Sequence, residues 1–414
     1  MMKPSTINQI LSKSFIFSLL SLILLLSITG CSHYKAPVSS AKNSTTVDKN
    51  TPSKITALSL NSLQSLNSIM PQLATHKAVL VGEIHTSYSD HLNQLAVIKG
   101  LHKKWGKIAI GLEMIQQPFQ SYLDDYIAGR ISEHAMLRGT EYFDRWRFDF
   151  RLYRPIFNYA KQNKIPLVAL NVPKELTKRI TKVGIKGLNK KERSQLPKTL
   201  DKSNQAYVKR LKSVFGGHST TSSKNFEKFF EAQLAWDEGM ADQAAKFLQT
   251  HSDHRIVILA GGGHIINREG IPDRLERRIK TRPAVVLNNI NENPKPTHGD
   301  YLLFSPEAKL PSIGRLGIAM KDSKQGVVIG SLLHHGAASK AGLKKVDIIQ
   351  RLDNTPIKTT TDLRLWALDK KPGDAVTAVI KRKHQSKTFK IVLGKKVPSL
   401  KSFHMKSMKG IHGK

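Results

Sequence analysis

The stretch that decides the fold is Ala78-Val-Leu-Val-Gly-Glu-Ile-His85, an apolar run that ends in a glycine, a carboxylate and an imidazole. Four similar apolar runs follow along the chain, at 108–112, 167–170, 256–260 and 284–287. A short continuous apolar run is typical of a strand that is buried on both faces. These five runs therefore predict a central sheet of mostly parallel strands.

Helical periodicity fills intervals between the apolar runs, at 91–104, 118–128, 153–163 and 226–249. Alternation of strands and helices predicts a parallel sheet with helices on its faces. Residues 174–248 contain no strand-like run, so we expect them to form a helical insertion that projects from the sheet. The predicted fold class is α/β, with a mostly parallel sheet flanked by helices.

Polar side chains stand at the ends of four predicted strands. The first strand leads into Glu83 and His85, and the second ends in Glu113. The third ends in Asn171, and the fourth in three glycines followed by His264. Ligands of open α/β sheets bind beyond the carboxyl ends of the strands. We therefore expect these five side chains to form one crevice for a ligand or metal.

Carboxylates and imidazoles in one crevice are competent for two tasks. Together they hold a divalent transition metal, or a carboxylate orients a histidine that acts as a general base. For any single residue a plainer interpretation holds, namely a glutamate that caps a helix or a histidine with satisfied hydrogen bonds. Because such groups recur at four successive strand ends, a functional site is the favoured interpretation.

Five separated blocks resemble the ChaN family of haem-binding lipoproteins, which belongs to a wider set of folds with the Tiki metalloproteases and erythromycin esterases. The blocks are GEIH at 82–85, GLEM at 111–114, IPLVALNVP at 165–173, EAQLAWDEGMA at 231–241 and AGGGHIINREGIPDRLERR at 260–278. The resemblance covers about residues 70–290. It implies haem binding for iron acquisition, with two haems stacked at a homodimer contact and iron held by a tyrosine.

The blocks do not assign that tyrosine to a position in this chain. A haem ligand is Tyr, His, Cys or Met, and Tyr207 and His218 lie in the helical insertion. Residues 174–228 hold fifteen Lys and Arg against four Asp and Glu. This surplus would pair with haem propionates, or it would contact membrane lipid. Tyr142 is a further candidate, in an aromatic cluster that would face a porphyrin or pack in the core: Tyr142, Phe143, Trp146 and Phe148.

The pattern changes after residue 302, which indicates a second, small α+β domain with mostly β structure. Segments 326–333, 337–354 and 372–382 resemble a bacterial PDZ domain, with Val346 in place of a usual glycine. The resemblance implies that Leu316, Gly317 and Ile318 hold the C-terminal carboxylate of a peptide, which adds as a strand. Leu363 would line the groove. A PDZ fold used only for dimerisation or docking is the alternative.

The start of the chain predicts export. Lys3 and Lys13 precede an apolar run at 15–28 that is too short for a comfortable membrane span. The run ends in Ile-Thr-Gly-Cys31, which resembles the lipobox of bacterial lipoproteins, and Cys31 is the only cysteine of the chain. An ordinary signal with a chance cysteine is the alternative. Acyl chains such as palmitate on Cys31 would anchor the protein durably. Ser32 favours the outer membrane, facing the periplasm or the cell surface.

The charge of the chain is strongly positive, with 66 Lys and Arg against 31 Asp and Glu. Such a field attracts polyanions. We expect no nucleic-acid partner, because no aromatic-interleaved basic motif is present and the protein is expected to leave the cytoplasm. Anionic lipid or an anionic small ligand suits the expected compartment better.

The expected organisation has six parts. They are a signal peptide at 1–30, a flexible tether at 31–55, a ChaN-like domain at 56–290, a linker at 291–301, a PDZ domain at 302–395 and a basic tail at 396–414. We expect a binding protein rather than an enzyme: a membrane-anchored haem-binding lipoprotein. The alternative is a metal-dependent hydrolase that uses the Glu83, His85, Glu113 and His264 crevice.

Overall fold

The computed structural model describes residues 59–216, 223–288, 290 and 293–395. The expected signal peptide, Cys31, the tether, His218 and the basic tail lie outside these residues. The chain divides into two units, residues 1–64 with 210–222 and residues 65–209 with 223–414. All the strands belong to the second unit, which holds both sheets.

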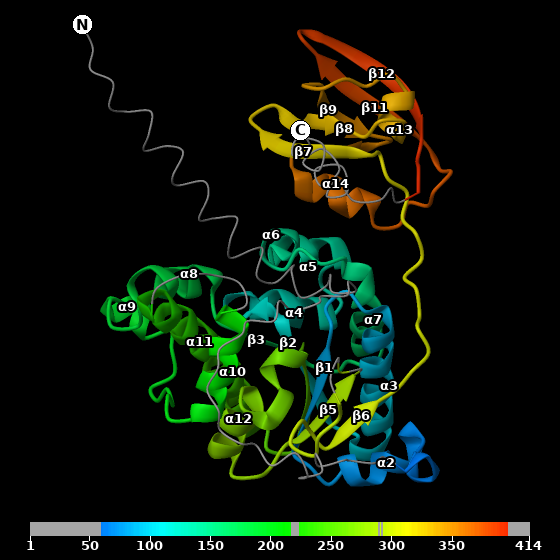
Figure 1. The fold of residues 1–414 in the computed structure, drawn as a ribbon. Coiled ribbons are helices and arrows are strands. Elements are labelled where there is room, and N and C mark those ends of the chain that lie inside the picture. Colours follow the sequence, from blue (N-terminus) through cyan, green and yellow to red (C-terminus); the bar gives the residue numbers. More distant parts are fainter. Residues whose placement is uncertain (1–58, 217–222, 289, 291–292, 396–414) are drawn as a thin grey trace, which may run out of the picture. The chain divides into compact units, whose positions relative to one another are not determined.

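The first sheet has six parallel strands in the order β3-β2-β4-β1-β5-β6 (Figure 1). This confirms the predicted α/β class. The strands are β1 (Ala78–Glu83), β2 (Ile108–Gln116), β3 (Leu167–Asn171), β4 (Arg255–Gly261), β5 (Ala284–Asn288) and β6 (Tyr301–Leu303). The five predicted strands all form, and every residue of β1 to β5 is buried except Gln116 at the end of β2 and Arg255 at the start of β4.

The strand β6 was not predicted. Residues 301–303 pair with β5, so the stretch from residue 302 that the sequence analysis gave to the PDZ domain begins inside the first sheet. Three residues with partly exposed side chains give no buried apolar run. The pairing partner, rather than the local sequence, makes this segment a strand.

Helices cover both faces of the sheet, as the alternation predicts. One face carries α3 (Tyr88–Trp105), α4 (Gln120–Ile127) and α7 (Arg154–Gln162), which bury Val97, Leu123 and Ile156 against it. The short elements around them are α2 (Leu66–Leu73), η3 (Gln117–Phe119), α5 (Glu133–Gly139), α6 (Tyr142–Arg145) and η4 (Phe150–Leu152). The other face carries α11 (Ser223–Thr250) and α12 (Ile271–Ile279).

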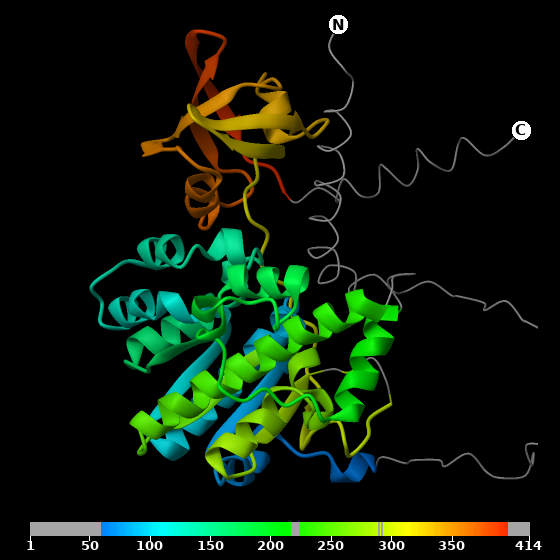
Figure 2. The same ribbon diagram turned by 90° about the vertical axis from the view of Figure 1, so that its left-hand side faces the viewer.

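The described part of the insertion contains helices joined by loops and no strand, but it does not only project from the sheet. It contains α8 (Lys174–Val183), α9 (Lys190–Arg193), α10 (Gln205–Gly216) and α11. Figure 2 shows these green helices, with the longest of them lying across the strands. Ala241, Ala244 and Leu248 of α11 pack in the same cluster as Ile256 and Ile258 of β4. The second half of the insertion therefore belongs to the helical layer on this face of the sheet. Its small apolar side chains allow α11 to pack closely against the strands.

The second sheet is antiparallel, in the order β12-β11-β9-β8-β7 with β10 beside β9. Its strands are β7 (Ile318–Ser323), β8 (Gly326–Leu332), β9 (Ile348–Leu352), β10 (Thr355–Pro356), β11 (Ala375–Arg382) and β12 (Gln385–Val392). Two helices, α13 (Ala337–Lys340) and α14 (Thr360–Ala367), complete this small domain. Its core is a cluster of apolar side chains drawn from residues 316–393.

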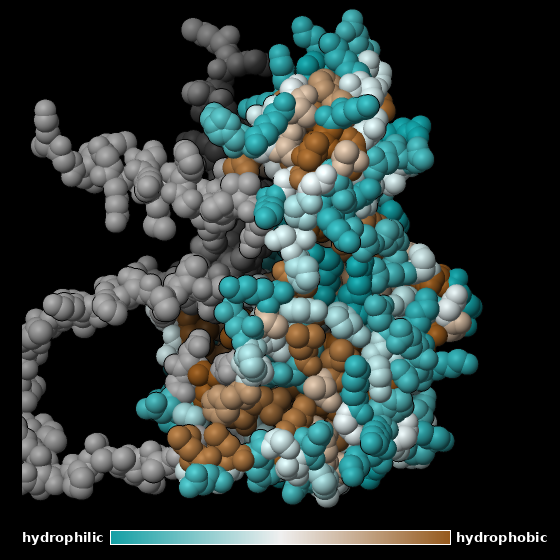
Figure 3. All heavy atoms as spheres, turned by 90° about the vertical axis from the view of Figure 1, so that its right-hand side faces the viewer, coloured by the Kyte–Doolittle hydropathy of each residue, from teal (hydrophilic) through white to brown (hydrophobic). Residues whose placement is uncertain are grey.

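Figure 3 shows one face of the molecule, on which hydrophilic residues predominate and hydrophobic residues gather in limited patches. Among the described helices, none combines the length and the apolar character that crossing a bilayer requires.

Candidate functional site

Glu83, at the end of β1, is the centre of a buried hydrogen-bond network. Its Oε1 accepts a hydrogen bond from the hydroxyl of Tyr153 at 2.7 Å and lies 2.8 Å from Nδ1 of His85. Its Oε2 lies 3.1 Å from Nδ1 of His91, on α3. Only 4% of Glu83 is exposed. A buried carboxylate needs such partners, because charge that leaves water without a partner is strongly destabilising.

The surroundings of Glu83 favour its charged form. Burial alone would raise the pKa of Glu83, but His91 and His85 outweigh burial and lower the pKa well below its usual value. Burial alone would lower the pKa of His91, whereas Glu83 raises it above 6.5 overall. Glu83 and His91 are therefore held as an ion pair inside the protein.

A second network joins β2 and β4 at the same edge of the sheet. Glu113 Oε2 accepts a hydrogen bond from the backbone N–H of Gly261 at 2.6 Å, and its Oε1 lies 3.4 Å from Nε2 of His264. The other ring nitrogen of His264 lies 2.5 Å from Asp237 on α11. Asn171 donates to the backbone carbonyl of Glu113 at 3.1 Å. Both ring nitrogens of His264 thus face carboxylates.

The two networks meet at Gly261, so the structure brings the predicted crevice residues together. A β-carbon on Gly261 would lie 2.9 Å from Cε1 of His85 and 3.7 Å from Oε2 of Glu113. A side chain at this position would therefore clash with His85, which is why the strand ends in glycine. Parallel pairing of β1, β4 and β2 accounts for the gathering, since their carboxyl ends share one edge.

The crevice suits proton transfer better than metal binding. Among the described residues, no group of three or more His, Cys, Asp or Glu side chains is arranged to hold a metal ion. The predicted divalent metal is therefore not supported. His85 has Nδ1 fixed by Glu83, while Nε2 lies near Gly261. A histidine oriented by a carboxylate in this way can accept a proton at its other nitrogen.

The predicted aromatic cluster borders this crevice. The ring of His85 lies 4.7 Å from that of Trp146 and 4.8 Å from that of Phe148, between centroids. Tyr142 and Phe143 are instead buried. The cluster therefore divides into two partly exposed rings beside His85 and two core rings. The plain packing interpretation holds for the core pair.

The structure places two haem-ligand candidates in the interior. Tyr207 is 1% exposed, its hydroxyl donates to Asp237 at 2.6 Å, and the guanidinium of Arg274 lies over its ring at 4.4 Å. Tyr142 is also 1% exposed, and burial raises the pKa of its hydroxyl well above its usual value. Iron ligation at either tyrosine therefore requires a movement that exposes the hydroxyl. His218 lies outside the described residues.

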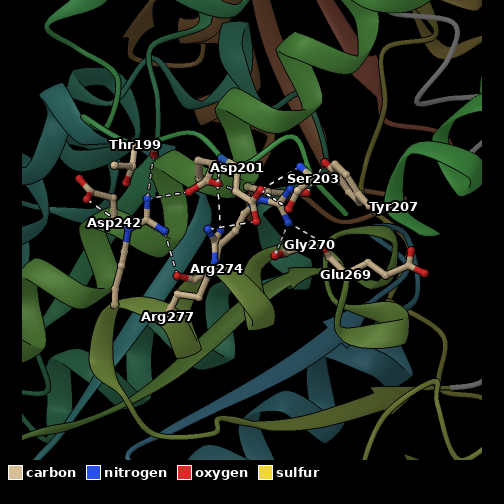
Figure 4. A network of polar contacts seen from close by, with 12 residues as sticks. Thr199, Asp201, Ser203, Tyr207, Asp242, Glu269, Gly270, Arg274 and Arg277 are labelled. Atoms are coloured by element: carbon tan, nitrogen blue, oxygen red, sulfur yellow. Dashed lines mark hydrogen bonds and ion pairs between the residues drawn. The ribbon is translucent and has the colours of Figure 1, made fainter. Parts of the chain in front are cut away.

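An ionic cluster lies beside Tyr207, as Figure 4 shows. Glu238 is fully buried and lies 2.6 Å from Arg278, 3.1 Å from Arg277 and 3.4 Å from Arg274. The same carboxylate accepts the backbone N–H of Asp201 at 2.8 Å. These contacts fix the start of the segment that carries Tyr207 against α11 and α12.

Three residues of the site were not predicted from the sequence: His91, Tyr153 and Asp237. Asp237 lies within the block EAQLAWDEGMA, so that block carried a signal for it. For His91 and Tyr153 the sequence predicts only that they lie in helical segments. Only the packing of α3 and of the turn before α7 against β1 brings them to Glu83.

The groove of the second domain has the predicted residues around it. β7 is the edge strand of its sheet, and Gly317 has a φ of 74°, which favours glycine. The backbone carbonyls of Leu316 and Gly317 accept hydrogen bonds from Ala338 and Leu333, both at 2.8 Å. Leu316, Gly317, Ile318 and Leu363 all line a depression between this loop and α14. An edge strand with unpaired backbone groups can accept a peptide as a further strand.

Comparison with protein families assigns the first domain. The family described as haem-binding uptake, Tiki superfamily, ChaN matches residues 69–275, which is half of the chain. The chain belongs to the ChaN family. The match contains both networks, since Glu83, Glu113 and His264 all lie within it. A PDZ domain family matches residues 314–393, so a PDZ domain follows the ChaN domain.

Individual similar proteins are distant. The chain is 20% identical to Protein RETICULATA-RELATED 5, chloroplastic, of Arabidopsis thaliana over 243 residues, covering 53% of this chain and 32% of that protein. The chain thus spans about a third of the length of this curated relative. ChaN of Campylobacter jejuni, solved with cofacially bound haem, has a TM-score of 0.47 at 18% identity, covering 58% of this chain and 91% of that one. The HtrA-type protease AlgW with a decapeptide has a TM-score of 0.21 at 20% identity, covering 21% and 31%.

Proposed function

We propose that this protein binds haem through its ChaN domain and serves iron acquisition from a lipid-anchored position. The observation that carries the proposal is the family match over residues 69–275. Haem iron would be held by a tyrosine or histidine. The cationic side chains of residues 174–228 would pair with the propionates.

An absorption spectrum can test whether Tyr207 is the haem ligand. Its hydroxyl reaches haem only if the hydrogen bond to Asp237 opens. In the experiment, residues 32–414 are titrated with haemin and the Soret band is recorded. We expect a saturable Soret shift that changes position in Tyr207→Phe. Tyr159→Phe, in which the lost hydroxyl contacts His102 instead, is the matched control.

Two results of this titration have different meanings. A wild-type chain without a saturable Soret shift contradicts haem binding itself. An unchanged spectrum in Tyr207→Phe, with normal binding, removes Tyr207 as the ligand and leaves Tyr142 and His218, which Tyr142→Phe and His218→Ala then test.

The acid–base crevice supports a second candidate function, namely hydrolysis. The observation in its favour is that Glu83 orients His85, whose ring lies close to the backbone of Gly261. A panel of chromogenic esters and peptides tests it. We expect turnover that persists with a chelator present and is lost in His85→Ala but kept in His254→Ala, a histidine that contacts Asp253 outside the crevice. No turnover above buffer with any probe contradicts this function.

We propose that the PDZ domain binds the C-terminus of a partner protein. The backbone N–H groups around Gly317 would hold the carboxylate, and Leu316 and Leu363 would contact the last side chain. Leu316→Asp should abolish capture of C-terminal peptides from a library. Val392→Asp, at a 64% exposed position on β12, should bind them normally. Equal binding by both variants contradicts this role.

We also propose that Cys31 carries the lipid anchor and that the protein resides in the outer membrane. The support is the sequence Ile-Thr-Gly-Cys31 after an apolar run. Cells labelled with radioactive palmitate should yield a labelled protein, and Cys31→Ser should lose the label. A label that persists in Cys31→Ser contradicts the anchor.

A further inference from the structure

We infer that the PDZ groove selects partner C-termini in which acidic side chains stand next to an aliphatic last residue. The inference rests on the PDZ function proposed above and adds the chemistry of the partner. Leu316, Leu333 and Leu363 line the groove. Pockets beside an added strand select its alternate side chains, so this apolar lining indicates an aliphatic last residue.

The charged side chains that the PDZ domain contributes to the groove are all cations. They are Arg315, Arg364 and Lys395, and none of the Asp side chains of residues 314–395 is among the described lining residues. Arg315 and Lys395 are exposed. An anionic group on a bound peptide can therefore reach both of them from solvent.

Backbone pairing holds two of these cations next to the carboxylate-binding loop. Arg315 and Gly394 exchange two backbone hydrogen bonds, each of 3.0 Å. Leu316 directly follows Arg315, and Lys395 directly follows Gly394. Both cationic side chains thus start from backbone that adjoins the loop proposed to hold the peptide carboxylate. The last residues of a bound peptide would lie beside them.

The carboxylates of the PDZ domain have other partners. Residues 314–395 hold 17 Lys and Arg against six Asp and no Glu. Three of the six pair with cations other than Arg315 and Lys395, and the other three accept backbone N–H groups. The ion pairs, at 2.6–2.8 Å, are Asp347 with Arg382, Asp353 with Lys370 and Asp369 with Arg154. The N–H groups, at 2.6–2.7 Å, are those of Thr360 to Asp322, Thr359 to Asp362 and Lys371 to Asp374.

The pleat of β7 indicates which peptide side chains would be acidic. Ile318 and Met320 pack against the core of the domain, whereas Ala319 and Lys321, which alternate with them, are exposed. Successive side chains of a strand point to opposite faces. If the last residue of the peptide faces the apolar lining, the penultimate and fourth-from-last residues face the same side as Lys321. Acidic side chains at these two positions would meet cations rather than apolar groups.

An acidic C-terminus is the occupant that uses all of these features together. The edge strand takes the peptide backbone, the loop takes its carboxylate and the cations take its acidic side chains. Complementary charge at the rim of a binding site selects partners and speeds association more than it adds affinity. One exposed ion pair changes an affinity by up to about 5-fold, so two pairs predict selectivity of roughly 10-fold.

The test compares pools of short peptides by fluorescence anisotropy. All end in leucine, and the penultimate and fourth-from-last residues are Glu in one pool and Gln in the other. A third pool has the same Glu residues and an amidated C-terminus. The protein is residues 32–414. The variant is Arg315→Gln with Lys395→Gln. The control is Lys383→Gln with Lys387→Gln, which removes the same charge near the turn between β11 and β12.

We expect wild type and the control to bind the Glu pool about 10-fold more tightly than the Gln pool, and the variant to bind both pools alike. The selectivity should fall as salt is added. The amidated pool should bind weakly to all three proteins. Thermal unfolding of the variant and the control verifies that they are folded.

The contrary results separate this inference from the PDZ function itself. Equal binding of the Glu and Gln pools by wild type overturns the acidic preference and leaves peptide capture intact. So does a variant that weakens both pools by the same factor, because Arg315 and Lys395 would then contact only the terminal carboxylate. Binding of no pool, or equal binding of the amidated pool, contradicts capture of C-termini and the inference with it.

Discussion

At the residue scale, Glu83 is the clearest case of a side chain defined by its partners. It contacts three side chains from separate segments, namely His85, His91 and Tyr153. A buried carboxylate with three partners rigidifies the end of β1, because these partners compensate its charge only while they stay in place. Glu83 in turn orients His85, so stability and the proposed chemistry share one residue.

The ion pair of Glu83 and His91 predicts a pH dependence of stability. The pKa of His91 is raised above 6.5 in the folded state, so its contribution is full below pH 6.5 and is lost as pH rises through the folded value. The pKa of Glu83 is lowered, so its contribution is lost only as pH falls from 4.5 toward the folded value. His91→Gln should cost about 2 kcal/mol near pH 5.5.

Chemical unfolding of wild type and His91→Gln across pH 4–9 measures this. The difference in the free energy of unfolding should shrink on the alkaline side. His76→Gln is the control, since that histidine contacts only a backbone carbonyl. A difference that is constant with pH would show that His91 contributes through shape rather than charge.

Val346 is a position at which we expect a substitution to stabilise the protein. Its φ of 65° is left-handed, which is strained for a β-branched residue, and 70% of it is exposed. Val346→Gly should therefore stabilise the PDZ domain by about 1 kcal/mol. Val392→Gly, at an exposed position within β12, should destabilise it instead. Thermal unfolding of the three proteins separates these outcomes.

At the element scale, α11 shows how packing overrides helix propensity. This helix contains Gly239 opposite β3, where a β-carbon would lie 2.3 Å from Cγ1 of Val172. Alanine is otherwise the better helix former by about 1 kcal/mol. The glycine is retained because α11 approaches the sheet closely, which also places Asp237 against His264.

Gly239→Ala should accordingly destabilise the ChaN domain by about 1–3 kcal/mol, although propensity alone predicts a gain. Gly100→Ala in α3 is the comparison, since its β-carbon would meet the flexible end of Met70. We expect a smaller loss there, because the thioether can move. Denaturant unfolding of both variants gives the comparison, and a stabilised Gly239→Ala would contradict the close packing.

At the scale of the whole molecule, the antiparallel sheet has an apolar cluster of its own. The core of the PDZ domain is drawn from residues 316–393, and its first and last segments meet where Arg315 pairs with Gly394. The single cysteine, Cys31, excludes a disulfide within the chain. The domain therefore depends on its own buried apolar side chains.

A fragment of residues 310–395 should consequently fold by itself. We expect a cooperative thermal transition by circular dichroism and dispersed amide signals by NMR. Reductant should not move the transition. A fragment without cooperative unfolding would mean that the domain needs contacts beyond residues 316–393. A longer fragment that begins at residue 293 would then test whether the preceding segment supplies them.

The sequence determined the α/β class, five of six parallel strands and both domain families, because buried runs and glycine-rich strand ends are local signals. It also identified Glu83, His85, Glu113, Asn171 and His264, since polar residues directly follow those runs. The tertiary structure alone decided that His91, Tyr153 and Asp237 complete the networks and that Tyr207 lies inside. Their partners are distant in the chain, so only the packing of helices on the sheet brings them within hydrogen-bond reach.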